Sequence, residues 1–560
     1  MFSLGVVLLF VLHLSVFLGI FHCKSVEDVK RPNIVIIMAD DLGSHDLSLS
    51  GCNEIMTPNI DALGYQGIIF NRHYTQSVCG PSRSALLTGK YPIHTGQQHS
   101  VILPDEPRGL PLDEKILPQY LKEAGYKTHI VGKWHLGYAR KTFTPTERGF
   151  DSHTGFLGGA TSYFNYTYWF NILGYNYPPG FDFYRNHEVY NEIIGQYATD
   201  VLTEEATKLI RDHDPLKDPF FLYLAHGTPH ASNSNAPLEA IPEDLETVAH
   251  INDPDRRTYA AMVKALDRSV GKVVTALKEK QMLENTIILF FSDNGAPTIG
   301  LYSNTGTNYP LRGQKQSPWE GALRGFAAIW STLFLQSHYV SNHLIHITDW
   351  LPTFAHVAGI SSYESKKLDG NNIWSTLLYN KPPSRNEILH NINPITGYTS
   401  YYYDKWKYIN GTTADGLYDM WLGYRIFEDS PESSSYENVI MQSDVWKALN
   451  PFAKRILRTT DVNELRRKTE IKCHRQKDAF NTCNPLKAPC LFHLEADPCE
   501  MINLADVQPG RVIEMQKRIR EFERTMVPPA NIPSDPNANP DFNDGLWTWW
   551  LDNQDSKVQN

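Results

Sequence analysis

The chain has 560 residues, of which 41% are hydrophobic and 20% are charged, and its formal net charge is −10. A chain of this length can bury a large core and has room for roughly two to four domains. The acidic balance argues against a nucleic-acid-binding protein, which would need a basic surface.

The N-terminal residues 2–21 are almost entirely apolar. We interpret residues 1–23 as a secretory signal peptide, and the alternative is an uncleaved membrane anchor. No later segment of the sequence is apolar over the length of a bilayer, so we expect no membrane attachment after cleavage. The expected location is the secretory pathway, with a lysosomal or an extracellular destination.

Buried strands and amphipathic helices alternate along the first half of the chain. Strands are predicted where β-branched and aromatic residues form continuous apolar runs, at residues 33–39, 128–131, 220–225 and 286–291. Helices are predicted from their apolar periodicity at residues 117–124, 197–211 and 259–280. This alternation predicts an α/β fold with helices on both faces of a sheet.

The character of the sequence changes near residue 380. Aromatic, hairpin-like segments such as 401–408 follow, then an irregular polar stretch at 416–449 and a helix near 511–524. We therefore predict a larger domain at residues 31–379. A smaller C-terminal domain at residues 380–560 should contain an antiparallel sheet and one packing helix.

Cys79 opens a short apolar run that glycine and proline delimit. Pro81 suits the first turn of a helix and Gly89 suits the position after its end. Cys79 would then stand at a helix N-terminus, where unpaired N–H groups attract anions, with Arg83 one turn away. On these residues alone, an enzyme for an anionic ester and a buried or disulfide-bonded cysteine weigh about equally.

The sequence Cys-Gly-Pro-Ser-Arg at 79–83, with Leu-Thr-Gly at 87–89, resembles the modification motif of the sulfatase family. In that family the cysteine is oxidised to formylglycine, whose hydrated aldehyde is the nucleophile. The resemblance covers almost the whole mature chain and is nearest to the arylsulfatase B, I and J branch. It implies an alkaline-phosphatase-like fold, with a large mixed sheet flanked by helices.

Oxygen-bearing side chains follow two of the predicted strands. Asp40 and Asp41 come directly after the first strand, and Asp293 and Asn294 come just after the fourth. Ligands of open α/β sheets bind beyond the carboxyl ends of strands, and these hard donors suit Ca²⁺ or Mg²⁺ better than Zn²⁺. Either pair alone would more often be a helix cap or a turn. The resemblance implies that all four, with residue 79, bind one Ca²⁺.

Three further segments contribute cationic side chains. The loop Gly-Lys-Trp-His-Leu-Gly at 132–137 resembles the second sulfatase motif and contains Lys133 and His135. His230 follows the third strand, in the position of the family's substrate-side histidine, and His226 is the alternative. Lys315 lies in a segment that resembles the family's Gly-x-Lys…Trp-Glu-Gly pattern, whose lysine contacts sulfate. On local pattern alone, the two lysines would be solvated surface residues.

The resemblance also implies a role for each residue. The hydrated formylglycine at position 79 attacks sulfur while Arg83 and Lys133 hold it. His230 and Lys315 bind sulfate and protonate the leaving oxygen, and His135 takes the proton that lets sulfate depart. A formylglycine-generating enzyme is the implied partner during biosynthesis.

The expected function is hydrolysis of a sulfate monoester, either a sulfated N-acetylgalactosamine glycan or a small sulfated metabolite such as a glucosinolate. One alternative is a phosphatase or phosphodiesterase of the same fold, with zinc ions and a Ser or Thr nucleophile. Another is a non-catalytic, glycan-binding pseudoenzyme. The oxygen-only ligand set and the filled catalytic positions disfavour both. Residues 231–235 form an insertion relative to the branch, beside the expected pocket, so the branch does not identify the substrate.

Cysteine usage and two sequons agree with secretion. Four C-terminal cysteines lack the spacing of zinc ligands, and we expect two local disulfides. Cys473–Cys483 with Cys490–Cys499 is our first choice of pairing, although the spacing alone leaves the connectivity open. Cys52 is expected to be unpaired and buried. The sequences Asn-Tyr-Thr at 165–167 and Asn-Gly-Thr at 410–412 are N-glycosylation sequons.

Overall fold

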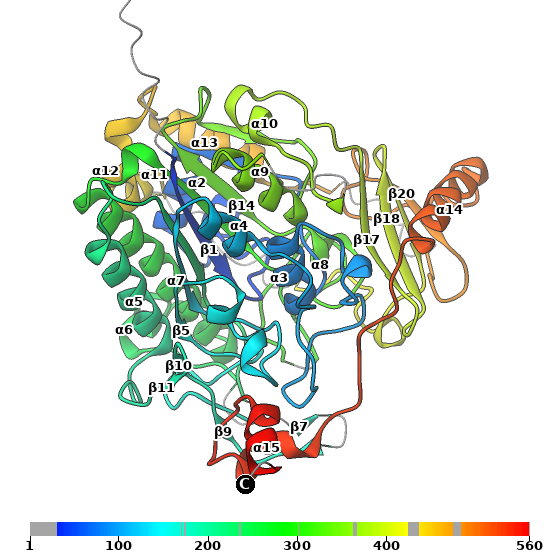
Figure 1. Ribbon diagram of the computed structural model, residues 1–560. Helices are drawn as coiled ribbons and strands as arrows, with labels where there is room; N and C mark the ends of the chain where they lie inside the picture. The colour runs from blue at the N-terminus through cyan, green and yellow to red at the C-terminus, as the bar shows by residue number, and fades with distance from the viewer. Residues whose placement is uncertain are drawn as a thin grey trace, which may run out of the picture. The chain divides into compact units, whose positions relative to one another are not determined.

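The computed structural model describes residues 31–169, 171–172, 175–233, 237–300, 302–361, 367–423, 436–473 and 483–558 (Figure 1). Residues 32–560 form one compact unit, which contains every element named below. The predicted signal peptide and residues 234–235 of the insertion lie outside the described residues. None of the described helices is long and apolar enough to cross a membrane.

A ten-stranded sheet forms the centre of this unit, in the order β11-β10-β5-β4-β12-β1-β13-β14-β2-β15. The five central strands, β5-β4-β12-β1-β13, run parallel to one another. On one side β14 is antiparallel to its neighbours β13 and β2, and on the other β10 is antiparallel to β5 and β11. The bounds are β1 Asn33–Ala39, β2 Ile68–Phe70, β4 Lys127–Gly132, β5 Ser152–Gly155, β10 Tyr184–Arg185, β11 Glu188–Val189, β12 Phe220–Ala225, β13 Thr286–Ser292, β14 Ala327–Ser331 and β15 Tyr339–Ser341. The sheet is mixed, as the resemblance implied, and the four predicted strands are correct to within one residue.

Strand β1 is buried on both faces, which explains its continuous apolar sequence. Val35 and Ile37 belong to one hydrophobic core, and Ile34 and Ile36 belong to the other. Helices α2 Pro58–Gln66, α5 Ala198–Asp212 and α7 Pro254–Glu279 cover the first core. Helices α3 Cys79–Thr88, α4 Leu117–Glu123 and α9 Trp350–Val357 cover the second, on the opposite side of the sheet (Figure 1).

The long helix α7 begins five residues earlier than predicted. Asp253 caps it, because its carboxylate accepts a hydrogen bond from the backbone N–H of Arg256 at 2.8 Å. Pro254 occupies the first turn, where its missing N–H is not needed. The apolar periodicity begins only at Tyr259, so periodicity alone misplaced the start.

A separate four-stranded antiparallel sheet lies in the C-terminal part of the chain, at the right of Figure 1. Its strands are β17 Glu387–Asn393, β18 Tyr398–Tyr403, β19 Trp406–Asn410 and β20 Cys490–His493. Helix α14 Pro509–Glu523 packs on it through Met515 and Ile519. The predicted antiparallel sheet with one packing helix is therefore confirmed, whereas the domain boundary near residue 380 stays a prediction.

The stretch 416–449 is not irregular throughout, contrary to the prediction. Residues 424–435 are outside the described residues, but α11 Tyr436–Met441 and α12 Asp444–Leu449 follow, and then α13 Thr459–Thr469. Val445 and Leu449 belong to the core beneath α2 and α7, so this segment returns to the large sheet. Each helix is too short for its apolar period to stand out among polar neighbours.

The predicted disulfide pairing is wrong. The structure pairs Cys473 with Cys499 and Cys483 with Cys490, while Cys52 and Cys79 are free and buried. The backbone N–H of Gly411, just after β19, donates to Pro485 O at 2.8 Å, which holds Cys483 beside the start of β20. The tertiary pairing of β19 with β20, and not the spacing in sequence, decides which thiols meet.

The remaining elements are short. They are β3 His73–Tyr74 with β16 Ile345–His346, β6 Thr167–Tyr168 with β9 Gly180–Phe181, β7 Asn171–Ile172 with β8 Tyr175–Asn176, α6 Pro242–Thr247, α8 Glu320–Leu323, α10 Trp374–Tyr379 and α15 Trp550–Val558.

Candidate active site

Two pairs of oxygen-bearing side chains meet at the carboxyl ends of β1 and β13. These strands are parallel neighbours, so Asp40 and Asp41 lie beside Asp293 and Asn294. The Asn294 amide donates to Asp41 Oδ1 at 2.6 Å, and the backbone N–H of Asp41 donates to Asp293 Oδ1 at 3.3 Å. All four residues are fully buried. The expected cluster is therefore assembled by the register of two central strands.

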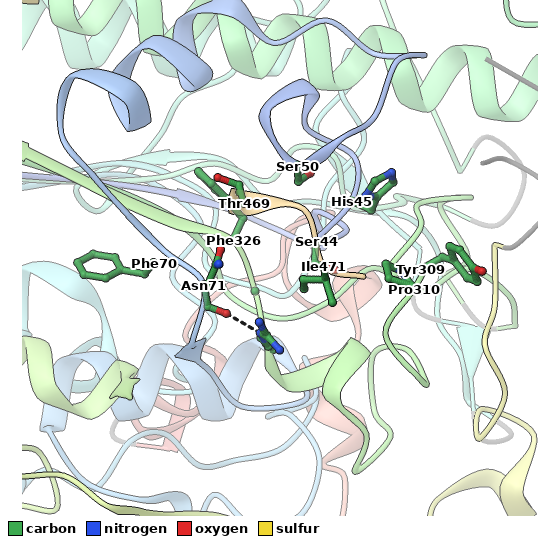
Figure 2. A pocket seen from close by; sticks show the side chains of 12 residues that line it. Ser44, His45, Ser50, Phe70, Asn71, Tyr309, Pro310, Phe326, Thr469 and Ile471 are labelled. Atoms are coloured by element: carbon green, nitrogen blue, oxygen red, sulfur yellow. Dashed lines mark hydrogen bonds between the residues drawn. The ribbon is translucent and has the colours of Figure 1, made fainter. Parts of the chain in front are cut away.

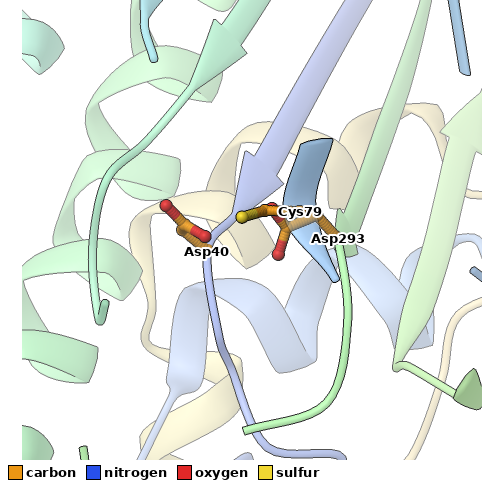
Figure 3. A group of neighbouring side chains, drawn as sticks. All are labelled: Asp40, Cys79 and Asp293. Carbon is orange, nitrogen blue, oxygen red and sulfur yellow. The ribbon is translucent and has the colours of Figure 1, made fainter. Parts of the chain in front are cut away.

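Cys79 begins helix α3 and faces this cluster. Figure 3 shows its sulfur between the carboxylates of Asp40 and Asp293, and the three ligand atoms lie within 4.8 Å of one another. Gly89 ends the helix with a φ of 67°, a conformation that favours glycine. The Ser82 hydroxyl donates to Asp293 O at 2.5 Å, so the first turn of α3 is fastened to the end of β13.

Three buried cations neutralise the carboxylates. Arg83 contacts Asp293 at 2.8 Å, Lys133 contacts Asp40 at 2.6 Å, and Lys315 contacts Asp41 at 2.7 Å. Burial opposes the charge of Lys315, but Asp41, Cys79 and Asp40 together outweigh burial and raise the lysine pKa. Burial and the Asp40 carboxylate together raise the pKa of Asp293 to about 6, against the opposing effect of Arg83.

Two oxygen atoms of the cluster have no hydrogen-bond partner among the described residues. Asp40 Oδ1 and Asn294 Oδ1 are both buried and both accept nothing. Buried polar atoms are normally satisfied, and an unsatisfied oxygen within a carboxylate cluster is suited to a cation. The donor set fits a hard divalent ion such as Ca²⁺ or Mg²⁺, whereas Zn²⁺ prefers nitrogen and sulfur ligands.

His135 lies over Cys79 in the loop after β4. Its Nδ1 is 3.3 Å from Cys79 Sγ, and its backbone has a φ of 57°, an uncommon conformation for a residue with a side chain. Burial lowers the pKa of His135 well below its usual value, and the neighbouring Lys133 and Arg83 lower it further. The imidazole is therefore neutral and able to accept a proton.

His230, and not His226, points to the cluster. His230 Nε2 is 3.4 Å from Asp41 Oδ2, whereas His226 Nε2 is 2.9 Å from the hydroxyl of Ser269, on α7. Burial and the charge of Lys315 lower the pKa of His230 well below its usual value. The side chain of Tyr163 fixes this segment, because its hydroxyl donates to His230 O at 2.8 Å.

The loop that contains Lys315 is held by contacts with the segment before Cys79 and with a tryptophan from the C-terminal part of the chain. The backbone N–H of Gln316 donates to Ser77 O at 2.7 Å, beside Cys79. Arg312 lies between Trp319 and Trp421, with its guanidinium carbon 3.6 and 4.7 Å from their ring centres. The C-terminal part of the chain therefore helps to position a lysine of the site.

Several supporting residues were not identified from the sequence. The Asn304 amide donates to Asp41 O at 2.9 Å and to Pro229 O at 3.1 Å, so it joins two of the site loops. Gly159 lies against the His135 ring, where an added Cβ would be 2.7 Å from Nε2. No local pattern distinguishes these residues, because their partners are distant in sequence.

A family model describes residues 32–360 as Sulfatase, which is more than half of the chain. The chain belongs to the sulfatase family. Its enzyme class is accordingly sulfuric ester hydrolase. The expected family and the expected enzyme class are both confirmed.

Three similar proteins support this assignment. Arylsulfatase J of Mus musculus is 37% identical over 538 residues, with 95% of this chain and 82% of that protein covered. N-acetylgalactosamine-6-sulfatase of Mus musculus is 32% identical over 365 residues, which cover 62% of this chain and 66% of that protein. The crystal structure of Ps i-CgsB in complex with k-i-k-neocarrahexaose has a TM-score of 0.68 and 28% identity, with 92% of this chain and 97% of that chain covered. The site therefore lies in a domain whose sequence and fold are those of sulfatases.

One cavity of the described chain shares no residue with the acidic cluster. Figure 2 shows it lined by Asn71, Tyr309 and Phe326 among others, with Arg324 Nε donating to Asn71 O at 2.5 Å. Among the described residues, those that line it include none of the predicted site residues and no carboxylate. The chemistry of the side chains therefore locates the sulfatase site, and this cavity does not.

Proposed function

We propose that this sulfatase hydrolyses sulfate monoesters with a formylglycine made from Cys79 and one bound Ca²⁺. The observation that carries the proposal is the position of the Cys79 sulfur, between two buried carboxylates and under His135. That sulfur occupies the place that an aldehyde or hydrate oxygen would take after modification. An oxygen there would complete a ligand set made only of oxygen atoms.

A bound divalent ion would give the pocket a net positive charge, which suits an anionic sulfate ester. Asp40, Asp41 and Asp293 are matched by Arg83, Lys133 and Lys315, so the buried pocket has little net charge without a metal. The side chains that would hold the ion are Asp40, Asp41, Asp293 and Asn294, together with residue 79. A bound Ca²⁺ supplies positive charge that attracts and polarises a sulfate ester. The unpartnered oxygens of Asp40 and Asn294 are the strongest support for that ion.

We assign two cationic side chains to binding residue 79 and two side chains to binding the substrate. Arg83, one turn along α3 from residue 79, and Lys133, bonded to Asp40, would hold the oxygens of residue 79. His230 and Lys315, both beside Asp41, bind the sulfate and supply the proton to the leaving oxygen. An incoming sulfate anion favours protonation of His230, which its surroundings otherwise keep neutral.

His135 serves as the base that ends the cycle. Its lowered pKa keeps the imidazole neutral, and its Nδ1 already points to the side chain of residue 79. Removal of a proton from the second hydroxyl of residue 79 allows sulfate to leave and regenerates the aldehyde.

The substrate proposal follows the relatives. One is named for N-acetylgalactosamine 6-sulfate, and one solved relative was crystallised with a neocarrahexaose. A sulfated N-acetylgalactosamine glycan is our first candidate, and a small sulfated metabolite such as a glucosinolate is the second.

We further propose that the protein enters the secretory pathway, has a lysosomal or extracellular location, and is modified by a formylglycine-generating enzyme. We also propose two domains, at residues 31–379 and 380–560.

The test is sulfate release by purified protein that was coexpressed with a formylglycine-generating enzyme. The panel contains sulfate and phosphate monoesters of the same alcohols, with Cys79→Ala as the control. We expect the wild type to hydrolyse the sulfate esters and Cys79→Ala to show no hydrolysis. Preferential turnover of the phosphates, dependent on zinc, would support a phosphatase instead, and binding of glycans without any turnover would support a pseudoenzyme.

A further inference from the structure

An aromatic pair borders the site on the side of His230. The Tyr302 ring lies against the His230 ring, with centres 5.7 Å apart. The hydroxyls of Tyr302 and Tyr168 are hydrogen-bonded at 2.6 Å. Tyr302 is half-buried, and Tyr168, at the end of β6, is 6% exposed. The two tyrosines therefore adjoin through their hydroxyls beside the proposed sulfate-binding side chains, and Tyr302 is the more exposed of the two.

Asn233 holds one end of this pair. Its amide accepts from the backbone N–H of Trp169 at 2.7 Å and donates to Thr167 O at 3.1 Å. One side chain therefore bonds to the backbone on both sides of Tyr168, much as a neighbouring strand would. Asn233 belongs to the segment 231–235, which we interpret from the sequence as an insertion relative to the arylsulfatase branch.

The C-terminal segment holds the other side of Tyr168. The Trp547 indole N–H donates to Tyr168 O at 2.9 Å, and the Trp547 ring packs against the rings of Tyr168 and Tyr177. Leu546 adds a bridge to Phe181. Trp547 is 1% exposed, so this contact is part of the core and not a surface contact.

We propose that Tyr168 and Tyr302 form the wall that binds the sugar ring of a sulfated carbohydrate, and that Asn233 and Trp547 position this wall. The inference rests on the proposed function and specifies its substrate class. A pyranose ring has apolar C–H faces and hydroxyls at its edge, which match aromatic faces that end in hydroxyl groups. Burial raises the pKa of both tyrosines, so their hydroxyls stay protonated, and within the pair one hydroxyl donates to the other.

The main test compares a sugar with an aryl substrate. The probes are N-acetylgalactosamine 4-sulfate, N-acetylgalactosamine 6-sulfate and 4-nitrophenyl sulfate. Tyr302→Ala should raise KM for the preferred sugar sulfate at least about tenfold, with kcat within about threefold. The loss of kcat/KM for 4-nitrophenyl sulfate should be smaller, because the nitrophenyl group lacks the sugar hydroxyls that would bond to the tyrosine hydroxyls. Tyr379→Ala is the matched control, since Tyr379 is a 46% exposed tyrosine on α10.

The positioning residues are tested with conservative changes. Asn233→Ala and Trp547→Phe should raise KM for the sugar sulfate by about three- to tenfold, because each removes the hydrogen bonds that orient Tyr168. Tyr302→Phe keeps the ring and should fold normally, with a smaller rise in KM than Tyr302→Ala. Equal losses for sugar and aryl sulfates, or losses confined to kcat, would overturn the proposal.

A binding measurement separates this inference from the proposed function. Calorimetry of the same sugar sulfates with Cys79→Ala protein needs no turnover. Tyr302→Ala in that background should weaken binding at least about tenfold. If the wild type releases no sulfate but this difference is found, the function fails and the wall stands. If the wild type is an active sulfatase and the sugar affinity is unchanged, the wall is wrong.

Discussion

Gly159 gives the proposed base of the site its position. A Cβ at this residue would lie 2.7 Å from His135 Nε2 and 2.8 Å from its Cε1. Ordinary contact begins near 3.4 Å, so in Gly159→Ala the ring or the loop must move by about 0.7 Å. The loop is held, because Asp182 accepts hydrogen bonds from the backbone N–H groups of Leu157 and Gly158 at 2.9 and 2.7 Å. We therefore expect the His135 ring to move away from residue 79.

The expected loss is in catalysis and not in folding. A displacement of about 1 Å in a catalytic group can cost a hundredfold in rate, so kcat should fall by about 10- to 100-fold. Gly159 has no positive φ, so alanine can adopt its backbone conformation. The unfolding free energy should therefore change by less than about 2 kcal/mol.

The assay is hydrolysis of 4-nitrophenyl sulfate by samples in which mass spectrometry has quantified the conversion of residue 79. Gly510→Ala is the matched control, because an added Cβ there has no atom within 4 Å and the residue lies in helix α14. It should keep full activity and gain up to about 1 kcal/mol of stability. Wild-type kcat in Gly159→Ala, or a loss explained by incomplete conversion, would refute the reasoning.

Three further predictions concern the ion and the histidines. Elemental analysis should find one Ca²⁺ per chain, and chelation should abolish activity that added Ca²⁺ restores; two zinc ions per chain would instead indicate a phosphatase. His135→Ala should accumulate sulfate bound to residue 79 in intact mass spectra, whereas His230→Ala should slow the first step most for esters with poor leaving groups; the opposite pattern would exchange the two roles. Burial lowers the pKa of His226 from 6.5 to about 3, so the folded protein keeps this histidine neutral while the unfolded chain binds a proton below about pH 6.5. The free energy of unfolding is therefore unaffected by His226 above pH 6.5 and decreases as the pH falls below it. Relative to His226→Gln, the wild type should lose on the order of 2 kcal/mol between pH 7 and pH 4.5 in urea unfolding, and parallel pH profiles would contradict this.

The sequence predicts the central strands well because their physical signal is local. A strand such as β1, buried on both faces, must be apolar throughout, and its carboxyl end then locates Asp40 and Asp41. The cap of α7 at Asp253 and the short helix α12 were missed, because a cap interrupts the apolar period and a six-residue helix hardly shows one. Periodicity therefore finds long elements better than their ends.

Contacts between distant segments are harder to predict. The disulfide pairing depends on the register of β19 with β20, which no cysteine spacing reveals. Asn304, Gly159 and Tyr302 support the site through partners that are far away in the sequence. The motif residues were identifiable because a family resemblance supplied the tertiary information that local patterns lack.

The chemical state of residue 79 tests the central claim most directly. The tryptic peptide 73–83 of purified, active enzyme contains this residue and can be analysed by mass spectrometry. We predict loss of sulfur and gain of oxygen at position 79, with specific activity proportional to the converted fraction across preparations. Cys79→Ala should fold normally and be inactive. An unmodified Cys79 thiol in fully active protein would contradict the account.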